Sequence, residues 1–282
     1  MPKYLKTLFI LLKNRYFIIS ASVIIGVSIL IFNHSPKKMV RVSYLDIGQG
    51  DAALIRTPNR KNILIDGGPD NLILYRLGER LPFYVRHLDY LIISHFHDDH
   101  INGLVEILKR YRVSKIIFAP SEISSPAVSA FQAEIKKLNI PVVSIESSGR
   151  LSLDEACILF FINPSGLNIK DNANNSLVTK LDCHGHRFLF AGDNELEAET
   201  ALLKSGFDLS ADIFKASHHG SKTSNMAAFL EAVKPQKMII SVGDDNRFGH
   251  PNQEVLDRVE IMGIDLWRTD IGGTIDILAE IK

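Results

Sequence analysis

The segment Ser94-His-Phe-His-Asp-Asp-His-Ile-Asn-Gly103 places three histidines and two aspartates within six consecutive positions. An apolar run from Leu88 to Ser94 is typical of a buried strand, and apolar residues recur at helical spacing after the cluster. The cluster is therefore predicted to be a strand-to-helix turn, in which side chains converge from two directions. Imidazole nitrogens and carboxylate oxygens suit Zn²⁺ and also accept Mn²⁺ or iron. Because so many ionisable groups held together without a cation would be costly, we interpret the cluster as the core of a metal site.

Three later strands are also predicted to end in polar groups. Residues 188–193 end in the carboxylate of Asp193, residues 212–220 end in two adjacent histidines, and residues 241–251 continue into a polar loop. In α/β folds, ligand chemistry is found at strand ends. The strand over residues 62–68 places Asp66 at its tip, where the carboxylate either orients a metal-ligating histidine or caps the turn.

Strands and helices alternate along most of the chain, which predicts an α/β fold. Strand patterns cover residues 114–119 and 140–145, with a helix pattern over residues 127–138 between them. Antiparallel strands are then expected over residues 151–162, 177–183 and 187–191, before the alternation resumes. The last two strands are expected over residues 265–268 and 274–278. The simplest architecture is two mixed halves, each with its own sheet and outer helices.

The N-terminal region differs from the rest. Residues 16–32 carry no charge and have about the minimum length that spans a bilayer. We expect a membrane anchor within residues 1–35, with a single-pass helix, and a folded domain over residues 36–282 outside the cytoplasm, because the N-terminus is rich in basic residues. A cleaved signal peptide, which would give a secreted protein, is the alternative. No convincing cleavage motif precedes His34, so we favour the retained anchor.

Charge and cysteine content limit the possible partners and compartment. The whole chain has 32 basic and 32 acidic residues, and four of the basic residues lie within residues 1–32, so the remainder carries a net charge of −4. That balance disfavours a broad basic face for tight non-specific binding of nucleic acid. Cys157 and Cys183 are the only cysteines. A disulfide in an oxidising compartment and two buried thiols both remain open.

The pattern His95-x-His97-x-Asp99-His100 is preceded by a strand that ends in Asp66 and followed by Asp193 and His218/His219. This series resembles the ligand motifs of the metallo-β-lactamase superfamily. Further motifs are Leu45-Asp-Ile-Gly-Gln-Gly-Asp-Ala52, Asn174-Asn-Ser-Leu-Val178, Phe214-Lys-Ala-Ser-His-His-Gly-Ser221 and Gly249-His-Pro251. In this order, over about residues 40–280, they resemble the hydrolase domain of ComEC-type DNA-uptake proteins. The resemblance implies an αβ/βα four-layer sandwich with a binuclear metal centre between its halves.

Mapped onto this sequence, the resemblance implies two divalent metal ions, Zn²⁺ or Mn²⁺. Asp193 would bridge them, and one of His218 and His219 would complete the second site. We favour His218 because it comes first after its strand. The other expected ligands are His95 and His97 for the first metal and Asp99 and His100 for the second.

The chain departs from the common superfamily pattern at one ligand. A third histidine normally joins the first metal, whereas this sequence has Asn174-Asn-Ser176 near the equivalent place, a substitution that ComEC-like members share. We expect Asn175 to lie next to the site. Since an amide oxygen is a weaker ligand than imidazole for Zn²⁺, the first site is expected to bind metal weakly or to prefer Mn²⁺. Occupancy by a single metal stays open.

Catalytic roles follow from the same resemblance. Asp99 or Asp193 is expected to orient the attacking hydroxide, and His250 either donates a proton to the leaving group, holds a phosphate oxygen, or is simply a loop histidine fixed by Pro251. Ser221 either binds phosphate or caps the next helix. Asn246 is a candidate for substrate contact.

The predicted function is a membrane-anchored, metal-dependent phosphodiesterase or nuclease that acts on DNA outside the cytoplasm. Only one membrane helix is predicted, whereas full-length ComEC proteins carry a many-helix channel. The chain is therefore expected to work beside separate DNA-uptake proteins or as a free-standing anchored hydrolase. One alternative substrate is a cell-wall phosphodiester, such as teichoic acid decorated with phosphorylcholine. A non-catalytic scaffold within an uptake complex is a further alternative, and β-lactam hydrolysis is disfavoured because fold alone does not specify substrate.

Overall fold

The computed structural model describes residues 14, 19–20, 22–23, 39–167 and 175–281. The chain divides into two compact units, residues 1–38 and residues 39–282. The expected membrane helix over residues 16–32 lies largely outside the described residues. Among those that are described, no helix combines the length and the apolar character needed to cross a bilayer.

The first sheet contains seven strands of the described chain, in the order β16-β1-β2-β3-β5-β7-β8. The strands from β16 to β3 are antiparallel neighbours, and those from β3 to β8 are parallel. The strands are β1 (Met39–Tyr44), β2 (Ala53–Arg56), β3 (Asn62–Ile65), β5 (Tyr90–Ile93), β7 (Ile116–Phe118), β8 (Val142–Ser144) and β16 (Ile275–Glu280). A separate short pair joins β4 (His87–Leu88) to β6 (Arg112–Val113).

The second sheet likewise contains seven strands within the described ranges, in the order β15-β14-β13-β12-β11-β10-β9. Its antiparallel part runs from β9 to β12, and its parallel part from β12 to β15. The strands are β9 (Ser148–Ser152), β10 (Cys157–Ile162), β11 (Val178–Cys183), β12 (His186–Phe190), β13 (Ile213–Lys215), β14 (Lys237–Ile240) and β15 (Asp265–Arg268). A disulfide joins Cys157 to Cys183, which are register partners on β10 and β11.

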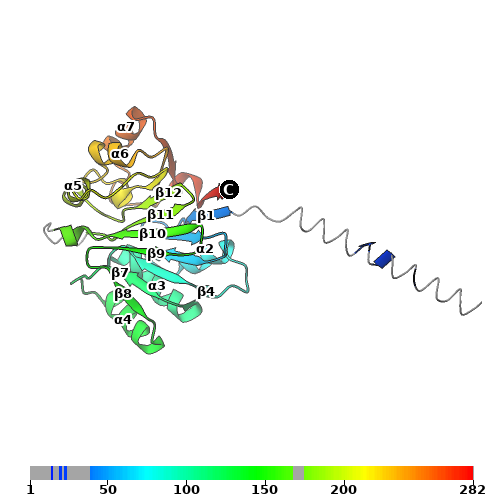
Figure 1. The fold of residues 1–282 in the computed structure, drawn as a ribbon. Helices are drawn as coiled ribbons and strands as arrows, with labels where there is room; N and C mark the ends of the chain where they lie inside the picture. Colours follow the sequence, from blue (N-terminus) through cyan, green and yellow to red (C-terminus); the bar gives the residue numbers. More distant parts are fainter. Residues whose placement is uncertain (1–13, 15–18, 21, 24–38, 168–174, 282) are drawn as a thin grey trace, which may run out of the picture. The chain divides into compact units, whose positions relative to one another are not determined.

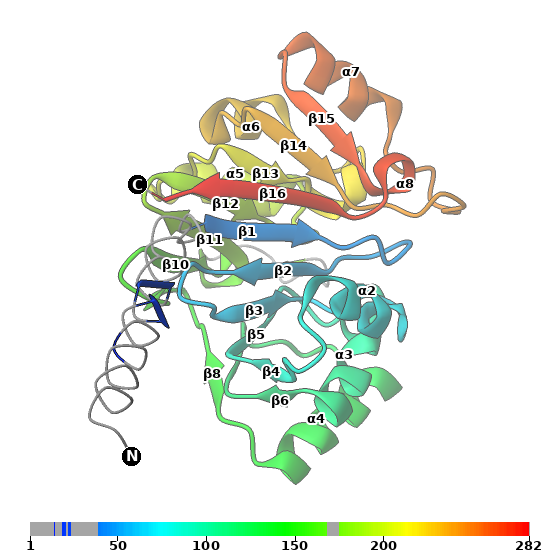
Figure 2. The same cartoon turned by 90° about the vertical axis from the view of Figure 1, so that its right-hand side faces the viewer.

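Helices cover the outer face of each sheet, which gives the four layers visible in Figure 1 and Figure 2. Those on the first sheet are α2 (Leu72–Arg80), α3 (Asp98–Arg110) and α4 (Pro126–Leu138). Those on the second sheet are α5 (Leu196–Lys204), α6 (Ala227–Val233) and α7 (Gln253–Ile261). Shorter helical turns are Pro164–Leu167, Ser217–Gly220 and α8 (Thr269–Gly272).

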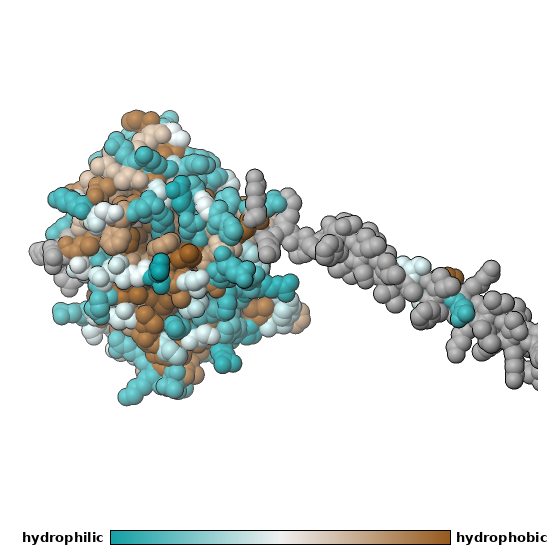
Figure 3. Space-filling model, viewed as in Figure 1, coloured by the Kyte–Doolittle hydropathy of each residue, from teal (hydrophilic) through white to brown (hydrophobic). Residues whose placement is uncertain are grey.

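The layers form because successive side chains along each strand point to opposite faces of the sheet. On β3, Ile63 and Ile65 enter the core between the two sheets, whereas Leu64 enters the core between the first sheet and its helices. On β14, Ile239 faces the inter-sheet core and Met238 faces the helices of the second sheet. Successive side chains of a strand point to opposite faces, so sheets covered on both sides require apolar residues at every position. Hydrophilic and hydrophobic residues are interspersed over the outer surface seen in Figure 3.

The four-layer sandwich expected from the sequence is confirmed, with one difference in topology. The two sheets match the expected two mixed halves, each with its own sheet and outer helices, and a strand forms near the expected residues 274–278. This last strand, however, does not stay with the half that precedes it. After α8, the chain returns to the first half, and β16 pairs antiparallel with β1 from Met39↔Glu280 to Tyr44↔Ile275. The last strand of the chain therefore forms an edge of the first sheet.

Candidate metal centre

The polar side chains of the centre come from strand ends in both halves. Asp66 follows β3 and His95 follows β5 in the first sheet, whereas Asp193 follows β12 in the second. His219 lies in the helical turn that follows β13, and its backbone is left-handed, with φ of 53°. The first turn of α3 supplies Asp99 and His100. The local sequence produces this arrangement because each apolar strand stops where its polar residues begin.

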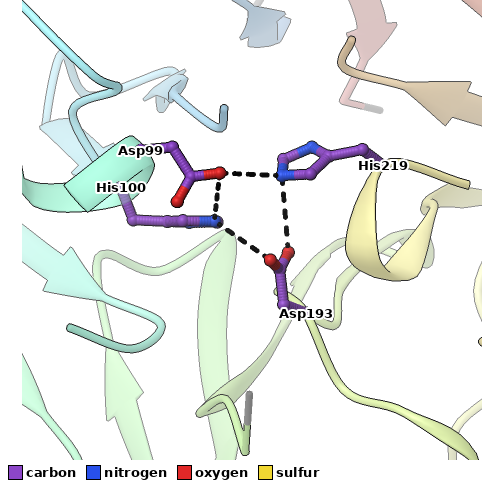
Figure 4. Close-up of side chains that lie close together, drawn as sticks. All are labelled: Asp99, His100, Asp193 and His219. Atoms are coloured by element: carbon purple, nitrogen blue, oxygen red, sulfur yellow. Dashed lines mark ion pairs between the residues drawn. The ribbon is translucent and has the colours of Figure 1, made fainter. Parts of the chain in front are cut away.

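Two groups of side chains share one carboxylate. The first contains His95, His97 and Asp193, and the second contains Asp99, His100, Asp193 and His219. Within each group, one ligand atom from every member lies within 4.8 Å of the others. Figure 4 shows the second group, with Asp99 and His100 from α3 facing Asp193 and His219 from the opposite half. Asp193 is therefore the residue that would contribute to both sites if each group held a metal ion.

The distances between these atoms fit a shared cation better than direct hydrogen bonds. Nε2 of His219 lies 3.4 Å from Oδ2 of Asp99 and 3.7 Å from Oδ1 of Asp193. Nε2 of His100 lies 3.5 Å from Oδ2 of Asp193, and Nε2 of His95 lies 3.8 Å from the same oxygen. Two ligands of a tetrahedral ion with bonds of 2.0–2.2 Å stand about 3.4 Å apart. The separations are thus close to those that an ion would impose.

Several of the same atoms have no hydrogen-bond partner in the part of the chain that the structure describes. They are Nε2 of His95, His100 and His219 and Oδ1 of Asp193, all of which are buried. Buried polar atoms without partners are rare, because each costs about 1–3 kcal/mol. Nitrogen and carboxylate oxygen together match the donor preferences of zinc and of related divalent metals. The residues therefore fit two divalent cations, and their chemistry alone does not distinguish zinc from manganese.

The other ring nitrogen of each buried histidine is held by a neighbour. Nδ1 of His100 lies 3.0 Å from Oδ2 of Asp66, and Nδ1 of His219 lies 2.9 Å from the carbonyl oxygen of Ser241. Since carboxylates and carbonyls only accept, both imidazoles donate from Nδ1, which leaves the lone pair on Nε2 for a metal. Asp66 thus contacts one of the expected metal ligands, as a carboxylate that orients a metal-ligating histidine would.

His95 is oriented through two serines. Its Nδ1 lies 3.1 Å from Oγ of Ser94 and 3.1 Å from Oγ of Ser176. The Ser94 hydroxyl donates to Asp66 across 2.7 Å, so its oxygen is left to accept from His95. The backbone N–H of Asp193 donates to Oγ of Ser176 across 2.8 Å, which ties the bridging carboxylate to the same hydroxyl. Ser176 thereby links a ligand of the first half to one of the second.

Close backbone approach at the centre requires glycine. A Cβ atom at Gly192 would lie 2.4 Å from Cβ of Ser176, and one at Gly50 would lie 2.2 Å from the carbonyl oxygen of Asp99. Both glycines have positive φ, at 55° and 138°. Gly192 thus brings the end of β12 against Ser176, and Gly50 brings the β1–β2 loop against the start of α3.

In the metal-free centre, the pKa values of the buried groups are shifted by the charges packed around them. Burial alone would lower the pKa of His100, but nearby carboxylates, of which Asp193 and Asp99 contribute most, hold it well above its usual value. The same balance, led by Asp193 and Asp51, raises the pKa of His219 to about 10. Burial would raise the pKa of Asp193, yet the imidazoles of His219 and His100 hold it well below its usual range. Two imidazolium protons therefore compensate the carboxylates, and bound metal would displace them.

The geometry selects between the two adjacent histidines. His219 belongs to the second group, whereas His218 is outside both groups, and its Nε2 stands 3.9 Å from Oδ2 of Asp193. Nδ1 of His218 lies 3.4 Å from Oε1 of Glu195. The preference for His218, based on its order after the strand, does not match this arrangement, because the left-handed backbone at both positions turns His219 inward.

The remaining candidates lie around the centre. The His250 ring centroid is 5.5 Å from that of His218 and 6.4 Å from that of His219, outside both metal groups. Burial, followed by repulsion from the same two imidazoles, lowers the pKa of His250 to about 4. Asn175 lines a cavity of about 220 Å³ beside His95, and its amide donates to Oγ of Ser165 across 3.3 Å.

Two further candidates stabilise loops. Oγ of Ser221 lies 2.9 Å from Oγ1 of Thr223, a contact within the turn that leads to α6. Asn246 bonds Gly243 and His250 and so shapes the loop that carries His250. Neither belongs to the two metal groups.

Sequence reasoning missed Ser94 and Ser176, which hold His95, and Lys215, which pairs with Asp51 beside His219. Nζ of Lys215 lies 2.7 Å from Oδ2 of Asp51, and both side chains are buried. Serine and lysine are common residues, so only their position within the quoted motifs could have identified them.

Comparison with known proteins agrees with this geometry. Residues 45–244 match the model of the Metallo-beta-lactamase superfamily. ComE operon protein 3 of Bacillus subtilis is 28% identical over 83% of this chain and 32% of its own length. Competence protein ComA of Neisseria gonorrhoeae is 31% identical over 85% of this chain and 32% of its own length. The resemblance to ComEC-type competence proteins is thus confirmed, and the chain spans about a third of the length of these relatives.

A solved structure supports the fold independently. A putative metal-dependent hydrolase from Parabacteroides distasonis superposes with a TM-score of 0.52 and 16% identity. The match covers 83% of this chain and 94% of the other.

Proposed function

The chain belongs to the metallo-β-lactamase superfamily, and on that premise we propose that it is a metal-dependent phosphodiesterase that cleaves DNA outside the cytoplasmic membrane. One observation carries the proposal. Asp193 is shared by two groups of donors, and the buried Nε2 atoms of His95, His100 and His219 in these groups have no hydrogen-bond partner among the described residues. Two cations held by groups that share a ligand would suit the displacement at a phosphodiester, which needs both the attacking and the leaving oxygen stabilised.

The donor groups assign the ligands. His95, His97 and Asp193 would hold one ion, and the second group would hold the other through Asp99, His100, Asp193 and His219. Bound divalent cations would supply Lewis acidity to a phosphoryl oxygen and make a water molecule more acidic. The first group contains three side-chain donors against four in the second, which supports weaker binding at the first position.

The protein side chains would orient the reactants. Asp99 is partly exposed to solvent, so its carboxylate would be accessible to accept a hydrogen bond from the attacking water. His250 lies beside His218 at the edge of the centre, where a ring N–H can donate to a phosphate oxygen. Hydrogen-bond donors aimed at developing negative charge typically contribute a factor of about 10²–10³ to the rate.

The relatives' names support DNA as the substrate. One is named competence protein ComA, another ComE operon protein 3, and a third, of Haemophilus influenzae, recombination protein 2. We propose that DNA-uptake proteins act beside this chain. The apolar residues 16–32 support a membrane anchor, and the Cys157–Cys183 disulfide supports an extracytoplasmic location, since disulfides persist in oxidising compartments.

The test uses the purified full-length protein with added Mn²⁺ or Zn²⁺. We expect cleavage of single- or double-stranded DNA and elemental analysis that finds metal bound to the chain. Asp193→Ala should lose metal from both positions and abolish cleavage, because both groups share this carboxylate. Asp98→Ala removes an exposed carboxylate next to Asp99 and should leave both properties unchanged.

Other outcomes would separate the alternatives. Hydrolysis of p-nitrophenyl phosphorylcholine without cleavage of any DNA would indicate that the substrate is a cell-wall phosphodiester. Full biological activity of His97→Ala together with absence of bound metal would favour a scaffold role and refute the enzyme.

A further inference from the structure

The loop between β14 and α7 is a rigid projection at the edge of the metal centre. The Asn246 side chain donates to the carbonyl oxygens of Gly243 and His250 across 2.9 and 2.7 Å, and it accepts from the His250 N–H across 2.9 Å. These three bonds close the loop at its base. Arg247 and Phe248, at its tip, are exposed.

Phe248 continues a series of rings that begins inside the centre. Its ring is stacked on that of His250, with centroids 5.9 Å apart and planes at 24°. His250 in turn lies next to His218 and His219. The Phe248 side chain remains 57% exposed, so much of its apolar surface is uncovered. An aromatic surface is thus held at a fixed distance from the place where a scissile phosphate would bind.

The charges on this loop limit what it can bind by attraction alone. The guanidinium of Arg247 lies 5.4 Å from the Phe248 ring centroid, where it can pair with a phosphate. However, the exposed carboxylates of Asp244 and Asp245 lie on the same loop. Because these acidic side chains offset the arginine, affinity for a nucleic acid strand must come mainly from stacking.

We propose that Phe248 is a stacking platform for one unpaired nucleobase next to the cleaved phosphate, so that the substrate is single-stranded nucleic acid. This proposal rests on the proposed phosphodiesterase function and narrows its substrate. Aromatic side chains stack on any base, whereas a base in a duplex is covered by its neighbours. The loop therefore favours single strands without selecting a sequence.

The experiment compares wild type, Phe248→Ala and Phe248→Trp as full-length proteins with Mn²⁺. The substrates are a short oligothymidylate, the same oligonucleotide with abasic sites, and a duplex. Phe248→Ala should lower kcat/KM on the oligothymidylate about tenfold, mainly by raising KM. On the abasic substrate, kcat/KM should be the same as for wild type. Phe248→Trp should restore the rate. The matched control, Phe83→Ala, removes a ring that is 86% exposed between α2 and β4, which supply no ligand, and should change nothing.

Binding of a fluorescein-labelled oligothymidylate in EDTA, followed by anisotropy, separates this proposal from the nuclease itself. If wild type cleaves no DNA but binding still depends on the Phe248 ring, the proposed nuclease function is refuted, whereas the role of Phe248 in stacking on a base is supported. Equal cleavage and binding by wild type and Phe248→Ala would overturn the platform. An equal loss on normal and abasic substrates would also overturn it, since the ring would then serve only the loop's structure.

Discussion

Lys215 donates a hydrogen bond from Nζ to Oδ2 of Asp51 across 2.7 Å, and the two side chains are only 4% and 9% exposed. Lys215 belongs to the second sheet and Asp51 to the β1–β2 loop of the first half. Oδ1 of Asp51 also lies 3.4 Å from Nδ1 of His219. Burial would raise the pKa of Asp51, but Lys215 and then His219 outweigh burial and lower it to about 2. The pair thus joins the two halves immediately beside the metal centre.

Replacing Lys215 by methionine should lower the free energy of unfolding by about 3–5 kcal/mol, because Asp51 would remain as an uncompensated buried charge. The double variant Lys215→Met with Asp51→Asn should recover much of that loss. Urea unfolding measures both. Lys137→Met, which breaks a pair with Glu134 on the exposed surface of α4, should cost less than about 1 kcal/mol. A similar small effect for Lys215→Met would contradict the assignment.

His219→Ala should reduce the bound metal by one equivalent per chain, whereas His218→Ala should retain both. The reason is that His219 points into the group formed with Asp99 and Asp193, and His218 faces Glu195. Elemental analysis of the purified variants decides between them. Loss of metal from His218→Ala alone would reverse the ligand assignment.

Ser176→Ala should weaken metal binding at the first position by about ten- to a hundredfold, because His95 and the backbone of Asp193 both lose their shared hydroxyl. Titration with Mn²⁺ or Zn²⁺ measures the affinity. Ser129→Ala, at an exposed position of α4, is the control and should bind metal as wild type does. Unchanged affinity in Ser176→Ala would show that His95 is oriented without this contact.

The buried carboxylate of Glu199 should lower the stability of the protein as the pH rises from mildly acidic to mildly basic. This carboxylate accepts from the backbone N–H groups of Asn225 and Met226 across 2.7 and 2.9 Å, and burial raises its pKa to about 7. Since the folded-state pKa exceeds the unfolded value, this contribution to stability is complete below about pH 4.5 and is lost as pH rises through 7.

Glu199→Gln stays neutral at every pH. From pH 5 to pH 8, its free energy of unfolding should therefore rise relative to wild type by about 2.5 kcal/mol. Glu197→Gln changes an exposed carboxylate on the same helix and should follow wild type. Parallel pH profiles for wild type and Glu199→Gln would rule out a raised pKa.

The disulfide should contribute about 3–4 kcal/mol to the free energy of unfolding, because Cys157 and Cys183 close a loop with a sequence separation of 26 residues. The double variant with alanine at both positions should lose this amount in urea unfolding. Wild-type protein unfolded without reductant should show no free thiol. Two titratable thiols under those conditions would contradict the cross-link.

The sequence predicted the densest part of the centre well, because its signals are local. Leu88 to Ser94 has strand character and Ile101 to Leu108 has helical spacing, so the turn between them had to present His95 and His100 together. Asp66 and Asp193 were found for the same reason, since each directly ends an apolar strand.

Other features depend on contacts between distant residues. Whether His218 or His219 points inward depends on left-handed backbone at both, which non-glycine residues rarely adopt and which their types do not reveal. Ser176 and His95 are 81 residues apart in the chain, and Lys215 and Asp51 are 164 apart. The alternation in residues 274–278 indicated a strand but carried no information about its partner.

The return of β16 to β1 has a consequence for any attempt to divide the protein. A polypeptide that stops before Ile275 would leave β1 with an open row of backbone donors and acceptors along Met39–Tyr44. Such unpaired edges recruit strands from other molecules and lead to aggregation. A chain cut between the two sheets would thus need its C-terminal piece supplied in trans, and reassembly of the two fragments would be driven by closure of that edge.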